Sequence, residues 1–248
     1  MRTPLSLLVL GLTFGALACG GSETDEGPSE AAPDTVETAD HDHEEIPDRS
    51  AEVARDEGSR PQVVMDFVGV EPGDRVVDVF AGSGYYTWLL SERVGPDGRV
   101  YAQGYSPGLM ARVARGDLAE ATNVTLVDSL SDLPADGVDH VLIIRGYHLF
   151  EDPAGLFEAL HRALVPGGTI GVVELRLGAD HGHDMETHRM GDRTVIDEFT
   201  SAGFELVESS DALRNPEDDH TGFWEGRRHL ADRMLLKFAE PDRDSAGR

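Results

Sequence analysis

Residues 76–86 read Val-Val-Asp-Val-Phe-Ala-Gly-Ser-Gly-Tyr-Tyr, an apolar strand that leads into a glycine turn and then into a helix. Glycine at positions 82 and 84 lets the backbone approach a ligand closely, and the amides that open the helix can bind a carboxylate or a phosphate. Ligands of open α/β sheets bind beyond the carboxyl ends of the strands, so this turn is the first candidate site. A lone Gly-x-Gly is weak evidence, because many turns need glycine only for their backbone geometry.

Strand and helix patterns alternate over the rest of the chain. Residues 138–144 form a near-continuous apolar run, which is typical of a parallel strand covered on both faces. Strands separated by helices at this pitch indicate βαβ units with right-handed crossovers. We therefore predict an α/β fold with a doubly wound, Rossmann-like sheet. The expected strands are residues 75–80, 99–102, 124–127, 138–144, 169–174, 205–209 and 234–238, and the expected helices are residues 49–57, 61–67, 86–94, 109–115, 156–164 and 195–202.

The N-terminus has the pattern of an export signal. Arg2 supplies a positive charge, residues 5–17 form an apolar run too short to span a bilayer comfortably, and small residues precede Cys19. This arrangement resembles the bacterial lipobox, in which the cysteine is lipidated and becomes the mature N-terminus. We expect residues 1–18 to be a lipoprotein signal peptide, and the protein to be exported and lipid-anchored in the bacterial cell envelope. An ordinary secretory signal cleaved near Cys19 is the alternative.

Residues 19–48 are expected to form an acidic, disordered tether. From residue 20 to residue 48 the chain has no Lys or Arg, and it carries too little apolar surface to offset its conformational entropy. Residues 49–248 remain as the folded domain. The formal net charge of −26 argues against binding to nucleic acid or to anionic lipid headgroups, so membrane contact is expected through the lipid anchor only. The sequence gives no indication of oligomeric state.

Four motifs together resemble class I S-adenosylmethionine-dependent methyltransferases. They are residues 76–84, residues 98–102, residues 139–144 and residues 160–168, which end in Leu-Val-Pro-Gly-Gly. The resemblance covers roughly residues 60–240. It implies a seven-stranded sheet that ends in an antiparallel strand pair, S-adenosylmethionine as cofactor, and methyl transfer to a small-molecule or lipid-associated acceptor.

Within that family the chain looks most like a group of bacterial, often exported, predicted methyltransferases. The shared residues are Tyr147-His148-Leu149, Leu213-Arg214-Asn215-Pro216 and Asp232-Arg233 leading into Leu236-Lys237-Phe238. We know of no substrate for this group, so the narrower match indicates fold more than reaction.

The resemblance implies a set of cofactor-binding residues and shows three departures from the family pattern. Gly104 stands where the second strand usually ends in an acid that binds the ribose, and Phe80 stands at a position that is commonly glycine. The acid that commonly approaches the adenine falls near Ser129. A neutral hydrogen bond from Gln103 or Tyr105 is weaker than one to a carboxylate, so weak cofactor binding, or none, is expected. The implied contacts are Asp78, Ala81, Gly82, Gly84, Tyr86, Gln103, Asp128, Ser129 and Arg145.

His148 is the candidate catalytic base. It follows the fourth expected strand, where substrate and cofactor should meet, and histidine titrates near neutral pH. Tyr147 is expected to stack on the substrate or the adenine. The alternative for His148 is a histidine packed at the end of a strand and hydrogen-bonded to the backbone.

Substrate contacts are expected from His181, His188, Arg189 and Arg214. The two histidines belong to a run of His, Asp and Glu at residues 180–188, which follows the fifth strand and can overhang the site as a polar flap. This run lacks the i, i+4 spacing of a paired metal motif, so no metal is expected. Arg189, Arg214 and Arg227 are candidates to bind an acidic substrate, and Arg214 ranks first because it belongs to the family match. In so acidic a domain these arginines can instead pair with its own carboxylates.

Two hypotheses of other classes remain. One is a non-catalytic envelope binding module on a degenerate methyltransferase fold, which Gly104 and the export signal favour. The other is a metal-dependent hydrolase that uses His181, His183 and Asp184.

Overall fold

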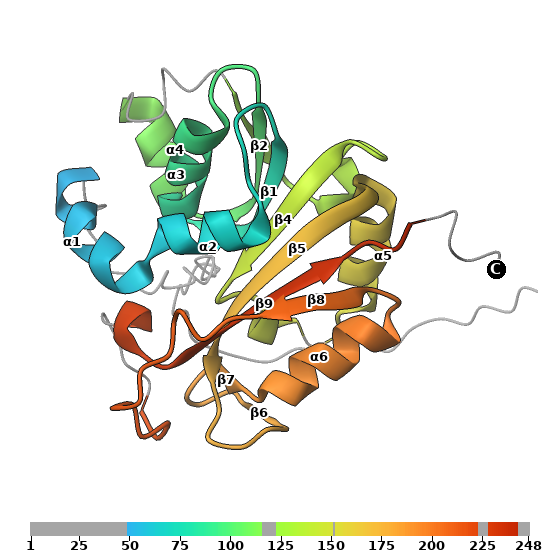
Figure 1. Cartoon of the computed structure of the whole chain (residues 1–248). Helices are drawn as coiled ribbons and strands as arrows, with labels where there is room; N and C mark the ends of the chain where they lie inside the picture. Colours follow the sequence, from blue (N-terminus) through green and yellow to red (C-terminus); the bar gives the residue numbers. More distant parts are fainter. Residues whose placement is uncertain (1–48, 116–122, 151, 223–227, 243–248) are drawn as a thin grey trace, which may run out of the picture. The chain divides into compact units, whose positions relative to one another are not determined.

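A computed structural model describes residues 49–115, 123–150, 152–222 and 228–242 of the 248-residue chain (Figure 1). The expected signal peptide, the lipidation site Cys19, the tether and Arg227 lie outside these residues. Within the described part no helix is long and apolar enough to cross a membrane.

One sheet forms the centre of the fold. Its strands lie in the order β3-β2-β1-β4-β5, all parallel, and β9 then pairs antiparallel with β5 and β8 antiparallel with β9. The predicted doubly wound α/β sheet with an antiparallel C-terminal pair is confirmed. The bounds are β1 Arg75–Gly82, β2 Arg99–Tyr105, β3 Val124–Val127, β4 Val138–Ile144, β5 Leu164–Arg176, β8 Glu205–Ser209 and β9 Arg233–Ala239.

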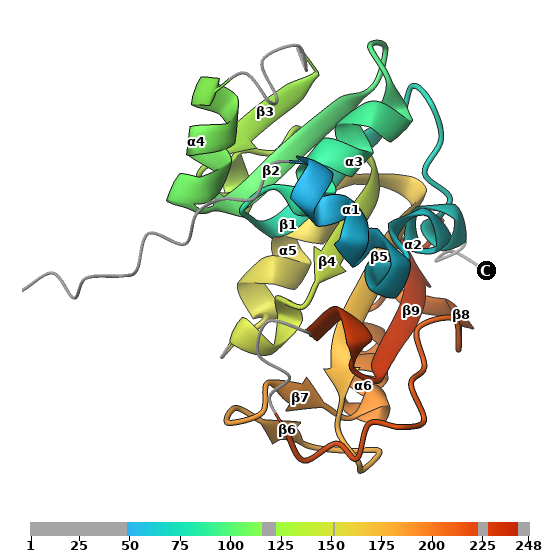
Figure 2. The same ribbon diagram turned by 90° about the vertical axis from the view of Figure 1, so that its left-hand side faces the viewer.

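Helices cover both faces of this sheet (Figure 1, Figure 2). Because side chains alternate along a strand, Val76 of β1 packs in one apolar cluster with α2 and α3, whereas Val77 packs in another with α5 and α6. Both clusters are closed to water, so the strands read as continuous apolar runs. The helices are α1 Arg49–Ser59, α2 Pro61–Val68, α3 Tyr85–Val94, α4 Pro107–Arg115, α5 Ala154–Ala163 and α6 Asp192–Ser201.

Glycine at position 171 of β5 sets the distance of α2 from the sheet. A Cβ atom there would lie 2.3 Å from Cγ2 of Val68, so any other residue would push α2 away. Thr169 fixes the same contact through a hydrogen bond from its hydroxyl to the Val68 carbonyl, at 3.0 Å. Helix α2 therefore packs closely against strand β5.

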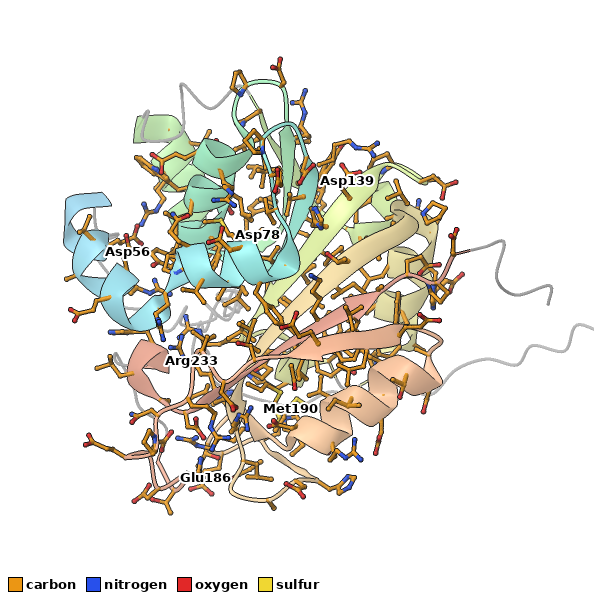
Figure 3. The ribbon with its side chains drawn as sticks, viewed as in Figure 1. Asp56, Asp78, Asp139, Glu186, Met190 and Arg233 are labelled. Atoms are coloured by element: carbon orange, nitrogen blue, oxygen red, sulfur yellow. The ribbon has the colours of Figure 1, made fainter. Side chains whose placement is uncertain are left out.

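The sheet differs from the seven strands expected. Two further two-residue strands, β6 (His183–Asp184) and β7 (Arg189–Met190), form a hairpin that joins the end of β5 through pairing of Leu175 with Arg189. The run expected to be a polar flap thus extends the sheet. Figure 3 shows Asp139 at the start of β4 and Glu186 in the β6–β7 connection at opposite ends of the sheet, so this hairpin lies at the end where β4 and β5 finish.

Candidate active site

The carboxyl ends of β1, β2 and β4 gather residues in an unusual backbone conformation. Phe80 and Gly82 in β1, Gly104 in β2 and Arg145 just after β4 all have φ between 54° and 65°. For a residue with a side chain this left-handed region costs about 1–2 kcal/mol. Phe80 and Arg145 are held there by the surrounding structure, and such strain at the ligand-binding end of an α/β sheet indicates a functional site.

The glycine turn brings α3 close to α4. Gly84 precedes the first residue of α3 with φ 85°, and a Cβ atom on it would lie 2.5 Å from Cδ1 of Leu109. Glycine at this position is therefore required both by the backbone and by packing.

Asp78 lies beneath this turn, 2% exposed, and accepts a hydrogen bond of 2.6 Å from the buried hydroxyl of Thr87 on α3. Figure 3 shows its place between the strands and the N-terminal helices. Burial raises the pKa of Asp78 to about 7, and the Thr87 hydrogen bond opposes this shift only in part. The folded protein therefore holds a proton on Asp78 at pH values where the unfolded chain has lost it.

This raised pKa predicts a pH dependence of stability. Between its ordinary pKa of 3.8 and its folded pKa of about 7, Asp78 makes the folded state bind more protons than the unfolded state. Its contribution to the free energy of unfolding therefore falls as pH rises through this window. Asp78→Asn, which has no such titration, is expected to weaken the pH dependence in urea unfolding measured from pH 4 to pH 8. Superimposable pH profiles for the two proteins would show that Asp78 ionises normally.

Two hollows flank the turn. The larger, of about 520 Å³, is bordered by Gln103, Asp128 and Ser129 from the ends of β2 and β3, together with Phe150. The smaller, of about 170 Å³, is bordered by residues from β1, α1, α3 and the end of β4: Arg55, Asp78, Phe80, Ala81, Gly82, Ser83, Tyr85, Tyr86, Ile144 and Arg145. All the residues predicted to bind the cofactor border one hollow or the other, except Gly84, which lies in the turn between β1 and α3.

Hydrogen bonds fix the side chains along part of the wall of the larger hollow. One acceptor in this wall has no partner among the described residues. The Tyr105 hydroxyl donates to Asp128 at 2.6 Å, and Ser129 caps a short helical turn, η1 (Leu130–Asp132). The side-chain oxygen Oε1 of Gln103 is buried and has no hydrogen-bond partner within the described residues. Leaving a buried acceptor unpaired costs about 1–3 kcal/mol, so this oxygen is suited to a donor from a ligand.

His148 lies in a buried chain of hydrogen bonds. It stands in the 3₁₀ turn η2 (Tyr147–Leu149), 6% exposed, and its Nδ1 is 3.0 Å from Oε2 of Glu174, which is fully buried in β5. The other carboxylate oxygen of Glu174 accepts the backbone N–H of Tyr147 at 2.6 Å. On its far side, Nε2 of His148 is 3.0 Å from Nδ1 of His188.

The hydrogen-bond partners of His148 and His188 determine which ring nitrogen of each histidine carries the proton. A carboxylate only accepts hydrogen bonds, so with Glu174 ionised the ring proton of His148 is on Nδ1, and Nε2 is an acceptor. His188 then donates its Nδ1 proton to that acceptor. The unprotonated nitrogen of each neutral ring thus faces away from Glu174, the arrangement by which a carboxylate orients a histidine base.

Glu174 is a functional candidate that sequence reasoning missed. It lies inside an apolar strand, 26 residues from His148, and no spacing rule links the two. A charged residue within a buried strand was the signal available. Tyr147, expected to stack on a ligand, is 2% exposed, packs among Phe150, Phe157 and Phe199, and donates its hydroxyl to Glu198 at 2.6 Å.

The two predicted substrate arginines lie in an ion-pair network beside the β6–β7 hairpin. Arg189 has no exposed side-chain surface, and its guanidinium binds both oxygens of the equally buried Asp218 at 3.0 Å. Arg214 is 43% exposed; its Nε donates to Asp232 at 2.9 Å, and it borders a third hollow of about 370 Å³. The structure thus encloses Arg189, whereas Arg214 keeps a free face.

The remaining histidines of the hairpin lie apart from this chain of hydrogen bonds. His181 is exposed and 4.0 Å from Asp197, and the exposed His183 has its ring centre 6.4 Å from that of His148. In the part of the chain that the structure describes, no three His, Cys, Asp or Glu residues converge as metal ligands.

A family model described as a methyltransferase domain matches residues 76–168, the stretch that contains the glycine turn, the larger hollow and His148. This stretch is therefore similar to methyltransferase domains.

Curated relatives of the chain are methyltransferases of small molecules, by their names. Arsenite methyltransferase of Halobacterium salinarum is 26% identical over 199 residues, which cover 72% of this chain and 49% of that protein. Demethylmenaquinone methyltransferase of Staphylococcus epidermidis is 32% identical over 114 residues, which cover 45% of this chain and 47% of that protein. The chain thus spans about half the length of the curated relatives it matches.

Solved structures of methyltransferases share the fold of this chain. An S-adenosylmethionine-dependent methyltransferase from Aquifex aeolicus superimposes with a TM-score of 0.58 at 20% identity, covering 75% of this chain and 92% of that one. The 1,6-didemethyltoxoflavin-N1-methyltransferase of Burkholderia thailandensis, solved with bound S-adenosylhomocysteine, gives 0.54 at 17% identity, covering 78% and 81%. The fold is that of the class I methyltransferases, whose cofactor is S-adenosylmethionine.

The residues that border the two hollows fit that cofactor. The larger hollow presents an unpaired acceptor, Oε1 of Gln103, beside the carboxylate of Asp128, as a nucleoside with hydroxyl and amino donors requires. The smaller hollow has the backbone of Gly82 and the cation Arg55 on its walls, which suits a charged amino-acid moiety.

Proposed function

We propose that this chain transfers a methyl group from S-adenosylmethionine to an unidentified small-molecule acceptor. The observation that carries the proposal is the buried Glu174–His148 pair at the end of the sheet where the glycine turn lies. A binding module has no need of a histidine oriented by a buried carboxylate, whereas an enzyme that must remove a proton from its acceptor does.

S-adenosylmethionine supplies an already activated methyl group, so the protein has to align the acceptor and receive its proton. Glu174 holds Nδ1 of His148, which leaves Nε2 to accept that proton. His188 occupies this acceptor position and is half-buried, so it has to give way before the substrate can reach Nε2. Asp78 and the glycine turn support the wall against which the cofactor lies.

The methyl acceptor and the location of the protein in the cell can be proposed more specifically. We propose a lipid-associated acceptor and an envelope protein held by lipid on Cys19, within the group of exported bacterial methyltransferases. The lipobox-like N-terminus supports this, and so does the contact between two of the group's motifs: Asp232 binds Arg214 and the backbone of Asn215. Cys19→Ser is expected to abolish partitioning of the protein into membranes, and a variant that still partitions there contradicts lipid anchoring.

The methyl transfer itself is tested with methyl-labelled S-adenosylmethionine. The purified protein is incubated with the label and with fractionated small-molecule and lipid extracts of a bacterial envelope. We expect the label to move into one acceptor fraction, and the heat-denatured protein serves as control. If the label stays in the cofactor with every fraction while S-adenosylhomocysteine still binds, the chain is a binding module.

The binding module is the second candidate because of Gly104, which lacks the side chain expected to bind the ribose. The position of Gly104 therefore bears on how the protein binds the ribose of the cofactor.

A further inference from the structure

The ring of Phe80 fills the space beside the ends of β2 and β4, the two strands that flank β1. A Cβ atom on Gly104, at the end of β2, would lie 3.1 Å from both Cα and Cδ1 of Phe80. A Cβ atom on Gly146, just after β4, would lie 2.7 Å from Cδ2 of the same ring. The contact at Gly146 is closer than real Cβ atoms approach, and the contacts at Gly104, whose φ is 65°, are tighter than most, so Phe80 favours glycine at both positions.

The same ring stands between the two hollows. Phe80 borders the smaller hollow, and it contacts Phe150 edge-on with ring centres 5.0 Å apart. Phe150 borders the larger hollow beside Gln103. A ligand that occupies both hollows must therefore pass along this aromatic pair, and aromatic faces favour flat, partly apolar groups such as a nucleoside.

Gln103 has a side chain at the end of β2 that can form a hydrogen bond in place of residue 104, whereas the hydroxyl of Tyr105 already donates to Asp128. It precedes Gly104, borders the larger hollow, and its Oε1 is buried without a partner among the described residues. A carboxamide oxygen accepts a hydroxyl proton but carries no full charge. It can replace a carboxylate as a ribose contact with a weaker bond.

We propose that Phe80 and Gly104 are a matched pair, in which the ring takes the volume of the acidic ribose-binding side chain and Gln103 binds the ribose of S-adenosylmethionine instead. This inference rests on the proposed function, because it concerns the cofactor of that reaction. The size of the Phe80 ring then explains both departures from the family pattern, the one at position 80 and the one at position 104. The hydrogen bond to the ribose comes from residue 103 instead of residue 104, and its acceptor carries no charge.

The first experiment titrates wild type and Gln103→Leu with S-adenosylhomocysteine and with adenosine by calorimetry, and records melting temperatures. We expect Gln103→Leu to bind both ligands about tenfold more weakly, the value of one neutral hydrogen bond. Its melting temperature should be equal or higher, because an unsatisfied buried oxygen is removed. Gln62→Leu, at an exposed position on α2, is the matched control and should bind as wild type does.

The second experiment is a double-mutant cycle at positions 80 and 104. Gly104→Asp alone is expected to lower the melting temperature and to bind no better than wild type, because its side chain meets Phe80. Phe80→Gly with Gly104→Asp should recover stability relative to Gly104→Asp and bind S-adenosylhomocysteine about tenfold more tightly than wild type does, as a charged acceptor exceeds a neutral one.

The outcomes separate this inference from the proposed function. Equal affinity of wild type and Gln103→Leu, or additive effects in the cycle, overturns the inference and leaves methyl transfer standing. Affinities that follow the expected order with no methyl acceptor found overturn the function and leave the ribose contact. If wild type binds neither ligand, both fail.

Discussion

His148→Ala is expected to lower methyl transfer about 10²–10⁴-fold, the usual contribution of a positioned general base, and to leave the affinity for S-adenosylhomocysteine unchanged. The affinity should not change because His148 borders neither hollow. Transfer should fall because Glu174 holds the His148 ring with Nε2 as the proton acceptor, and the variant lacks this acceptor. The measurement is transfer of label from methyl-labelled S-adenosylmethionine to the acceptor fraction, beside a calorimetric titration of the same preparation.

Glu174→Gln is the companion variant. Because Glu174 holds the His148 ring through Nδ1, its effect on transfer passes through His148, and the losses in Glu174→Gln and His148→Ala should not add in the double variant. The pH profile of transfer should also change in Glu174→Gln, since the amide no longer fixes Nδ1 as the protonated nitrogen. Wild-type transfer by His148→Ala would contradict the assigned role and leave His148 as a packed residue at the end of a strand.

Arg189→Ala is expected to lower the free energy of unfolding by about 3–5 kcal/mol, the range for breaking a buried ion pair from one side. Both side chains of the Arg189–Asp218 pair are fully enclosed, so the variant leaves the Asp218 carboxylate buried without its cation. Arg189 also donates to the carbonyls of Arg176 and Gly222, which ties β7 to β5 and to the C-terminal loop. Urea unfolding gives the measurement.

Two further variants make this prediction sharp. Arg193→Ala, on the exposed side of α6, is the matched control and should stay within about 0.5 kcal/mol of wild type. Arg189→Met with Asp218→Leu should recover much of the loss, because no charge is then left buried. If Arg189→Ala keeps its stability but loses affinity for the acceptor, the substrate role predicted from sequence stands instead.

The sequence predicted the centre of the fold well because its signals there are local. The strand, glycine turn and helix at residues 76–86 follow from apolar runs and from glycines whose positive φ the structure shows. The antiparallel pairing of β8 and β9 was implied by the resemblance to class I methyltransferases. The β6–β7 hairpin was missed, since strands of two residues have no periodicity to detect.

Sequence predicted only those parts of the candidate site whose residues lie close together in one segment of the chain. Sequence indicated Gly104 and Phe80 as separate departures, but that they touch depends on the pairing of β1 with β2. Glu174 reaches His148 across β4 and β5, and Arg189 meets Asp218 across a loop, so neither contact has a sequence spacing. Long-range pairs of this kind are decided by the tertiary fold.

Binding of the cofactor is the claim on which the rest depends. Calorimetric titration of the purified protein with S-adenosylhomocysteine tests it most directly, with Gly84→Val as control, because that side chain would meet Leu109 and disturb the turn. We predict saturable binding of one ligand per chain by wild type and loss of binding in the control. The absence of heat from wild type at ligand concentrations of about 1 mM, where even a Kd at the weak end of specific binding is detected, would contradict the account.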